Sequence, residues 1–197
     1  MSTPSPSQST ITGPACLWVI SGPSGAGKGT LCDWLCAQHP EWYWSISATT
    51  RAPRAHETHG REYLFWTDEQ FRQAIAEDGL IEWAVYNNCT YGTPKAPILE
   101  RLARGQSCLL EIEVQGALQL KAQFGSQAQF IFIAPPSIEV LRSRLTARQT
   151  NTADDIENRL SIAQEELAQQ HLFDAVIVND DLATTKQALA KRIATCL

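Results

Sequence analysis

The stretch CLWVISGPSGAGKGT, residues 16–30, decides the fold of this chain. Its first part, residues 16–21, is a short apolar run of the kind that forms a buried parallel strand. The part that follows, GPSGAGKGT, fits the phosphate-loop pattern G-x-x-x-x-G-K. Residues 28–38 then place Leu31 and Leu35 on one side of a predicted helix. A strand, a glycine-rich loop and a helix in this order predict a site that holds phosphate groups.

The residue types in this loop suit phosphate binding. Glycine permits backbone turns that other residues avoid, so successive N–H groups can point inward toward phosphate oxygens. The first turn of the helix adds partial positive charge, and Lys28 adds a mobile full charge for the outer phosphates. Gly29 follows Lys28 where many phosphate loops carry a metal-binding Ser or Thr, so Thr30 is the nearest hydroxyl. An ordinary glycine-rich turn is the alternative, and the flanking strand and helix argue against it.

Length and charge narrow the classes of function. At 197 residues and 21.8 kDa, the chain has room for one domain, or for one core with small inserted lobes. Sixteen Lys and Arg against twenty-one Asp and Glu give a net charge of −5. The chain therefore lacks the bulk positive field of non-specific nucleic-acid binders, and we expect no nucleic-acid partner. Anionic ligands must be held by local geometry, for which the eleven arginines are suited by their bidentate contacts to phosphate.

The sequence carries no evident targeting or membrane signal. Residues 1–15 are rich in Ser, Thr and Pro and carry no charge, so we expect a flexible tail rather than a secretory signal. No stretch approaches the roughly 18 apolar residues of a membrane span, so no membrane partner is expected. The six cysteines lack an oxidising context and the spacing of zinc ligands, and we interpret them as structural thiols. Together these features predict a cytoplasmic protein.

The order of the predicted elements indicates an α/β fold. Strands are predicted at 16–21, 44–47, 62–66, 80–86, 107–111, 129–134 and 175–178. Helices are predicted at 28–38, 68–77, 94–104, 114–123, 137–147, 153–170 and 183–195. Strands and helices alternate in the first fifth and the last half of the chain, which is typical of a parallel sheet flanked by helices. Residues of about 45–93 hold short strands and one isolated helix, which predicts a small mixed lobe inserted into that core.

A second candidate phosphate site lies in SATTRAPR, residues 47–54. Arg51 and Arg54 are three residues apart and have hydroxyl side chains around them. Two guanidinium forks can hold one phosphate through several charge-assisted hydrogen bonds. An exposed basic loop is the alternative interpretation of this string.

Further short motifs follow in a fixed order. They are HGREY (59–63), LIEW (80–83), TYGT (90–93), LEIEVQG (110–116), IFIAPPS (131–137), RLTAR (144–148) and VIVNDD (176–181). With the two phosphate motifs, this order strongly resembles the guanylate kinases, which phosphorylate GMP from ATP. The resemblance runs from about Leu17 to the C-terminus. It implies one domain at 16–197, with a phosphate-loop core at 16–44, 94–137 and 169–197, a GMP-binding lobe at about 45–93 and a small helical lid at about 138–168.

The resemblance also implies roles for side chains in GMP binding. The GMP phosphate would be held by Arg51, Arg54, Tyr63 and Tyr91, and the guanine by Ser47, Glu82, Thr93 and Glu113. The chemistry of guanine agrees, because a carboxylate can accept from its N1–H and N2–H groups while a hydroxyl donates to O6. Adenine would leave a buried carboxylate without a donor. Taken alone, Glu82 also fits a structural salt bridge, and the tyrosines also fit core aromatics.

On the donor side, the resemblance implies that the phosphate loop binds ATP with Mg²⁺. The ATP-binding residues would be Gly22, Pro23, Ser24, Gly25, Ala26, Gly27, Lys28, Gly29 and Thr30, with Asn179 at the adenine. Thr30 and Glu111 would meet the metal, Glu111 through water. The family commonly has Asp-Ile-Asp where this chain has Glu111-Ile-Glu113, so each carboxylate here is one methylene longer.

Catalysis would rest on cations around the transferring phosphoryl group. The predicted catalytic residues are Lys28, Arg51, Arg144, Arg148 and Arg159, the last three as arginines of the lid. A solvated helix face paired with neighbouring acidic residues is the alternative interpretation of those three. Gln149 stands where the family usually has Gly, which puts the local turn in doubt but not the arginines.

The predicted reaction is transfer of the γ-phosphoryl group of ATP to GMP, giving ADP and GDP, by a monomer or small homo-oligomer. Two alternatives stay open at this point. One is a non-catalytic module that keeps this fold for protein recognition, and the intact phosphate loop argues against it. The other is a phosphate-loop kinase for another phosphorylated acceptor such as a ribose bisphosphate, which would not need Glu82 and Thr93 as base readers.

Overall fold

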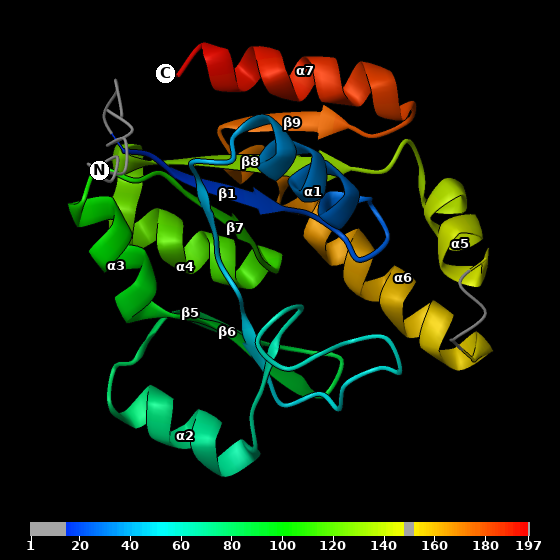
Figure 1. The fold of residues 1–197 in the computed structure, drawn as a ribbon. Coiled ribbons are helices and arrows are strands. Elements are labelled where there is room, and N and C mark those ends of the chain that lie inside the picture. The colour runs from blue at the N-terminus through cyan, green and yellow to red at the C-terminus, as the bar shows by residue number, and fades with distance from the viewer. Residues whose placement is uncertain (1–14, 148–151, 197) are drawn as a thin grey trace, which may run out of the picture.

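The computed structural model describes residues 15–147 and 152–196. Its larger part is built on a five-stranded parallel sheet with the order β2-β7-β1-β8-β9 (Figure 1). The strands of this sheet are β1 (Leu17–Ser21), β2 (Tyr43–Trp44), β7 (Cys108–Glu111), β8 (Ala128–Ala134) and β9 (Ala175–Val178). β1 lies at the centre, and the next strands on its two sides come from later parts of the chain. The carboxyl end of β1 is therefore the switch point at which ligands bind in open α/β sheets.

The core fills both faces of this sheet, because side chains alternate along each strand. The helices are α1 (Lys28–Gln38), α2 (Asp68–Ala76), α3 (Lys95–Ala103), α4 (Val114–Phe124), α5 (Ile138–Ala147), α6 (Ala153–Ala168) and α7 (Leu182–Ala194), with 3₁₀ turns η1 (Gly125–Gln127) and η2 (Gln170–Leu172). Leu17 and Val19 of β1 pack toward α3 and α4, whereas Trp18 and Ile20 pack toward α1 and α7 (Figure 1). Burial on both faces explains the unbroken apolar run that opens the fold. The predicted α/β class with a parallel core is confirmed.

A second, four-stranded sheet lies beside the core and has the order β4-β3-β6-β5. Its strands are β3 (Ala48–Thr49), β4 (Leu64–Phe65), β5 (Leu80–Tyr86) and β6 (Cys89–Pro94). The hairpin of β5 and β6 turns at Asn87 and Asn88, whose φ angles of 47° and 61° suit the twist of a two-residue turn. β6 is not among the strands predicted from the sequence. The Asn-Asn pair after an apolar strand was the signal that could have indicated it.

The chain crosses between the two sheets within residues 44–48. The sequence predicts one strand over 44–47, and this is wrong. β2 ends at Trp44, Ser45 N–H still donates to Leu109 O of the core at 2.9 Å, and Ser47 O already accepts from Leu64 N–H at 2.9 Å. Ser47 is thereby placed at the junction of the sheets, facing the space between them.

Helices α5 and α6 form a separate arm beside the core (Figure 1). Leu141 and Leu145 of α5 pack on Leu160 and Ala163 of α6. An exposed ion pair of Arg142 with Glu157 also joins the two helices. The connection between them, 148–151, lies outside the described residues, as do 1–14 and 197, so the predictions for the tail, Arg148 and Gln149 lie there too.

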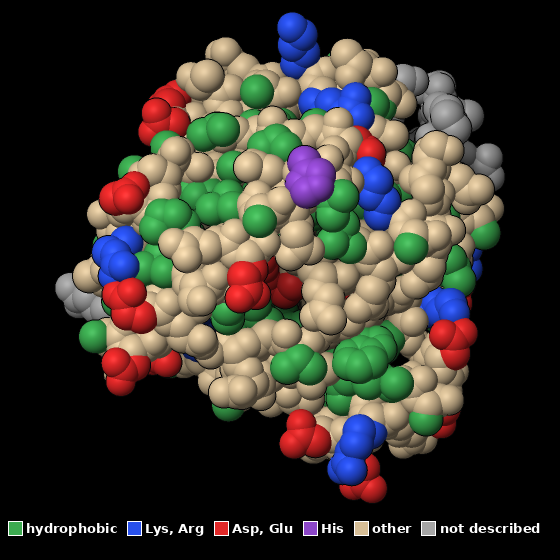
Figure 2. Space-filling model, turned by 180° about the vertical axis from the view of Figure 1, so that it is seen from behind, with side chains coloured by type: hydrophobic (Ala, Val, Ile, Leu, Met, Phe, Trp, Pro, Cys, Tyr) green, Lys and Arg blue, Asp and Glu red, His purple; other side chains and the backbone are tan. Residues whose placement is uncertain are grey.

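The surface is mixed in charge. On the face seen in Figure 2, acidic and basic side chains are interspersed, and hydrophobic side chains gather in small patches between them. Within residues 15–147 and 152–196, no helix is both long and apolar enough to cross a lipid bilayer. All six cysteines are free thiols, and Cys32 and Cys108 are buried.

Candidate active site

The phosphate loop joins the end of β1 to the start of α1. Gly22 has a φ of 134°, and a Cβ there would lie 2.2 Å from Ile133 O, so only glycine fits. Gly27, with a φ of 95°, occupies the N-cap of α1 and offers no side chain to cap it. The first turn of α1 also carries no acidic side chain. Its first backbone N–H groups therefore lack a side-chain cap and could bind an external anion, and the predicted phosphate site stays a prediction.

Lys28 is the first residue of α1, and its side chain folds back over this loop. Its Nζ donates to Gly22 O at 2.5 Å and to Pro23 O at 3.2 Å, and the residue is only 8% exposed. These carbonyls hold the ammonium group beside the loop. A phosphate in the loop would meet a cation that is already in position.

Asn179 contacts the backbone of the phosphate loop through its side-chain amide. It follows β9, it is buried, and its Nδ2 donates to Ala26 O at 2.7 Å. A Cβ on Gly27 would lie 2.3 Å from that same nitrogen. Arg144 of α5 in turn donates to Asn179 O at 2.8 Å. The structure therefore directs the amide nitrogen of Asn179 at the loop backbone, and the predicted adenine contact stays a prediction.

Glu111 ends β7 beside the start of α1. Burial raises the pKa of its carboxyl group, Lys28 opposes that shift, and Glu113 adds to it. A Cβ on Gly29 would lie 3.6 Å from one Glu111 oxygen and 3.8 Å from the other. The missing side chain of Gly29 leaves space beside this carboxylate, and Thr30 contributes an exposed hydroxyl nearby in the chain. An all-oxygen donor set of this kind fits Mg²⁺ that keeps part of its water shell.

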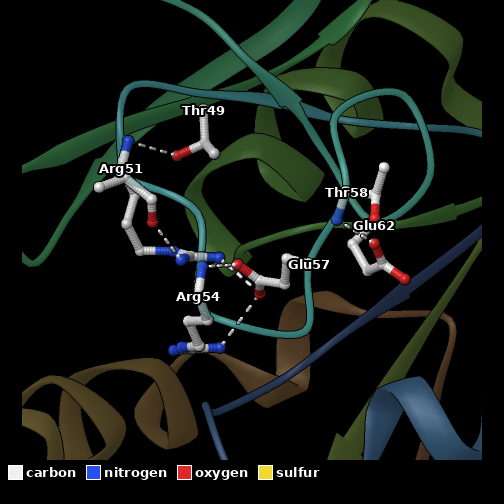
Figure 3. A network of polar contacts seen from close by, with 7 residues as sticks. Thr49, Arg51, Arg54, Glu57, Thr58 and Glu62 are labelled. Atoms are coloured by element: carbon white, nitrogen blue, oxygen red, sulfur yellow. Dashed lines mark hydrogen bonds and ion pairs between the residues drawn. The ribbon is translucent and has the colours of Figure 1, made fainter.

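The acceptor side begins with Arg51 and Arg54, which follow β3 on one loop (Figure 3). Both arginines contact the carboxylate of Glu57. The guanidinium of Arg51 also lies over the ring of Tyr63, 5.5 Å from its centroid. The rings of Tyr63 and Tyr91 meet edge to face with centroids 6.0 Å apart. The four residues predicted to hold the acceptor phosphate are therefore neighbours.

The predicted base-reading residues meet in a narrow slot between the two sheets. It is lined in part by Ser47, Glu82 and Glu113, and it holds only ≈20 Å³. Thr93, fully buried, donates to Glu82 Oε1 at 2.6 Å. A hydroxyl has one proton, so the predicted contact of Thr93 with O6 of guanine requires the hydroxyl to turn away from Glu82. Burial raises the pKa of Glu82 to about 7.

Glu113 is the second carboxylate of this slot. It occupies the N-cap of α4 but makes no capping hydrogen bond. Its Oε2 is buried and has no hydrogen-bond partner within the described part of the chain. A buried acceptor without a donor is costly, so this oxygen suits a ligand N–H group.

One cavity of ≈340 Å³ brings the two sides together. Of the predicted site residues, it is lined by Ser24, Gly25, Gly27, Lys28, Gly29, Thr30, Arg51, Arg54, Tyr63, Tyr91, Glu111, Glu113 and Arg159. The predicted site residues that are not among its described lining residues are Gly22, Pro23, Ala26, Ser47, Glu82, Thr93, Arg144 and Asn179, of which Ser47 and Glu82 line the narrow slot. Arg144 and Asn179 are linked to the loop by the hydrogen bonds described above, and the predicted catalytic role of Arg144 stays a prediction. The cavity is thus bordered by the phosphate loop on one side and by the arginine pair on the other.

Comparison with known proteins gives the family of this chain. The family model described as guanylate kinase matches residues 15–195. The chain belongs to the guanylate kinase family. It is 48% identical over 188 residues to the guanylate kinase of Synechocystis sp., covering 95% of this chain and 97% of that protein. It is 50% identical over 175 residues to that of Gloeobacter violaceus, covering 89% and 85%.

Structural similarity leads to the same family. The crystal structure of guanylate kinase from Anaplasma phagocytophilum matches with a TM-score of 0.76 and 28% identity, covering 94% of this chain and 88% of that one. The chain is therefore an enzyme of the guanylate kinase family that uses ATP to phosphorylate GMP to GDP. The non-catalytic module and the sugar-phosphate kinase considered above are set aside.

Several residues around this guanylate kinase site were not identified from the sequence. Asp33 and Tyr86 line the main cavity, and Glu57 holds the arginine pair. A Cβ on Gly116 of α4 would lie 2.1 Å from Glu82 Oε2, so this glycine makes room for the slot carboxylate. The HET string after the arginines and the glycine in EVQG were visible in the sequence. Only the fold shows what they contact.

Proposed function

We propose that the ≈340 Å³ cavity is where the phosphate of GMP meets the γ-phosphate of ATP. One observation carries this assignment. Lys28 and the open N-terminus of α1 border the cavity on one side, and Arg51 with Arg54 borders it on the other. Two separate groups of cationic donors facing one space are what a phosphoryl transfer between two anions needs.

The acceptor is proposed to bind with its phosphate on Arg51, Arg54, Tyr63 and Tyr91. Its guanine then enters the slot of Ser47, Glu82 and Glu113. Oε2 of Glu113 has no hydrogen-bond partner among the residues that the structure describes. This oxygen and the carboxylate of Glu82 are proposed as acceptors for the N1–H and N2–H donors of guanine. A slot of ≈20 Å³ holds roughly one water, so guanine binding requires movement around it.

The donor is proposed to bind with its phosphates in the loop of residues 22–30. Glu111 and Thr30 are the residues that would hold Mg²⁺, with Glu111 acting through water. Mg²⁺, when bound with ATP, would neutralise charge on the β- and γ-phosphates. Asn179 fixes the floor of the loop through Ala26, and Arg144 fixes Asn179.

Chemistry then follows from position and charge. A phosphate monoester has a second pKa of about 6, so the acceptor oxygen is anionic near neutral pH and needs no general base. Lys28, Arg51 and Arg159 face the cavity and stabilise the charge that spreads over the transferring group. Arg148 is proposed to join them from the lid. The enzyme is proposed to work in the cytoplasm as a monomer or small homo-oligomer.

A coupled assay tests this assignment of the acceptor. ADP production is followed with GMP, AMP, CMP, UMP and a ribose bisphosphate as acceptors, with and without Mg²⁺. We expect turnover with GMP to exceed turnover with AMP by at least about 10²-fold, because adenine presents an acceptor at N1 and no amino group at C2 to the slot carboxylates. Equal turnover with GMP and AMP would overturn the proposed roles of Glu82 and Glu113.

A further inference from the structure

The carboxylate of Glu57 lies between the two arginines of the acceptor loop (Figure 3). Its Oε1 accepts from Arg51 Nη2 at 2.8 Å and from Arg54 Nη1 at 3.5 Å. Its Oε2 accepts from the backbone N–H of Arg54 at 2.7 Å. One side chain thus contacts both guanidinium groups and the backbone that carries the second one.

Burial places Glu57 behind the arginines. Its side chain is 5% exposed, whereas those of Arg51 and Arg54 are 18% and 48% exposed. Both arginines line the ≈340 Å³ cavity, and Glu57 is not among the described residues that do. Glu57 therefore contacts the arginines from the side away from the substrate space.

The negative charge of Glu57 reduces the repulsion between the two arginines. Two guanidinium groups that converge on one phosphate repel each other while the phosphate is absent. Burial by itself raises the pKa of Glu57, but the hydrogen bonds from Arg51 and Arg54 outweigh it, so the pKa lies below its ordinary value. The carboxylate is therefore ionised at neutral pH and offsets one of the two positive charges.

The arginines keep donors for a ligand. Arg51 uses Nη2 for Glu57 and Nη1 for Ala52 O at 2.7 Å. A guanidinium has five N–H donors, so these two contacts leave others for a phosphate. Glu57 can thus hold the arginines without blocking their function.

We propose that Glu57 is a positioning residue, which holds Arg51 and Arg54 converged as a preformed cradle for the acceptor phosphate. This inference rests on the proposed assignment of the two arginines to that phosphate. Glu57 acts through them and makes no contact with substrate. Its loss spreads the arginines apart before GMP arrives, so GMP binding must then bring them together.

The test compares Glu57→Gln with Glu62→Gln, a matched variant on the same loop. Glu62 Oε2 accepts from Thr58 N–H at 2.7 Å (Figure 3), and its Oε1 pairs with exposed Arg61 rather than with Arg51 or Arg54. We expect Glu57→Gln to raise KM for GMP about tenfold, the loss expected for a hydrogen bond to a charged group. KM for ATP is expected to stay unchanged and kcat to change by less than about threefold. Glu57→Asp, which keeps the charge, should recover part of the loss.

The outcomes separate this inference from the proposed function. If Arg51→Lys and Arg54→Lys leave KM for GMP unchanged, the assignment of the arginines to the acceptor phosphate fails. If those variants raise KM but Glu57→Gln does not, only the positioning role fails. A lower KM in Glu57→Gln would mean that the carboxylate competes with the phosphate, and equal effects of Glu57→Gln and Glu62→Gln on KM would mean a purely structural role. Either result overturns the proposal.

Discussion

The donor and acceptor sides of this enzyme are built in different ways. The donor site is one continuous segment, residues 22–30, which runs from the end of β1 into the first turn of α1. The acceptor side gathers residues from the loops around β3 and β4, from β5 and from the N-terminus of α4, namely Ser47, Arg51, Tyr63, Glu82 and Glu113. A site made of one segment depends on local backbone geometry. A site made of many segments depends on how those segments pack, so changes outside it should affect it more.

The largest effect is expected at the donor loop itself. Lys28→Ala removes the buried cation that borders the cavity, and we expect kcat to fall by on the order of 10²–10³-fold. KM for GMP should change little, because the acceptor side is left intact. Lys95→Ala, which removes a cation paired with exposed Asp78, is the control and should leave turnover unchanged. Near-normal kcat in Lys28→Ala would contradict the proposed role of this residue.

The difference between the two sides also decides what could be predicted from the sequence. The strand, the phosphate loop and α1 follow from apolar pattern and glycine spacing, because each is local. The residues around guanine came only with the resemblance to guanylate kinases, since spacing along the chain does not say which segments meet. The strand predicted over 44–47 was wrong because an apolar run does not show where a chain leaves one sheet for another. Glu57 was missed because its partners are defined by the bend of the loop.

Gly116 tests the dependence of the acceptor side on packing between segments. It lies on α4, and Glu82 of β5 occupies the space that a side chain at position 116 would need. In Gly116→Ala the new Cβ would meet Glu82 Oε2 at 2.1 Å, so the carboxylate must shift from the position in which it accepts from Thr93. Displacing a binding group by about 1 Å can cost about 10²-fold, and we expect kcat/KM for GMP to fall by that amount. KM for ATP should not change.

The control for this variant is Gln115→Ala, which removes an exposed side chain from the same helix. A thermal melt of both proteins checks that they are folded. If Gly116→Ala raised KM for ATP and KM for GMP equally, the effect would be general unfolding of α4, and the inferred link between Gly116 and guanine binding would be lost.

A smaller effect is expected from pH, and it should also be confined to the acceptor side. Burial raises the pKa of Glu82 to about 7, and guanine donors require its ionised form. KM for GMP should therefore be flat above pH 7 and should rise as pH falls, by up to about tenfold per pH unit. GMP itself titrates with a pKa of about 6, so the ratio of KM values between the native enzyme and Glu82→Gln is the quantity to measure. If the ratio of the two KM values stayed independent of pH between about 5.5 and about 8, the prediction would be contradicted.

The raised pKa of Glu82 also predicts how stability depends on pH. Raising the pH is expected to improve GMP binding but to lower the free energy of unfolding. The folded protein binds the Glu82 proton more tightly than the unfolded chain, whose glutamates titrate at about 4.3. Between about pH 4.3 and the folded pKa of about 7, the contribution of this group to the free energy of unfolding therefore decreases as pH rises. Glu82→Gln should remove that component from a series of melts in the absence of GMP.

The smallest effect is expected at Asn179. This residue tests whether the donor site depends only on its own segment of the chain. It lies 153 residues from Ala26, yet its amide donates to the carbonyl in the centre of the loop. Asn179→Ala removes that bond, and we expect KM for ATP to rise roughly three- to tenfold with no change in KM for GMP. Asp180→Ala, at the exposed neighbouring position, should change neither value. If Asn179→Ala raised KM for GMP as much as KM for ATP, the floor of the loop and the acceptor side would be one coupled unit, and the contrast between a local donor site and a dispersed acceptor site would not hold.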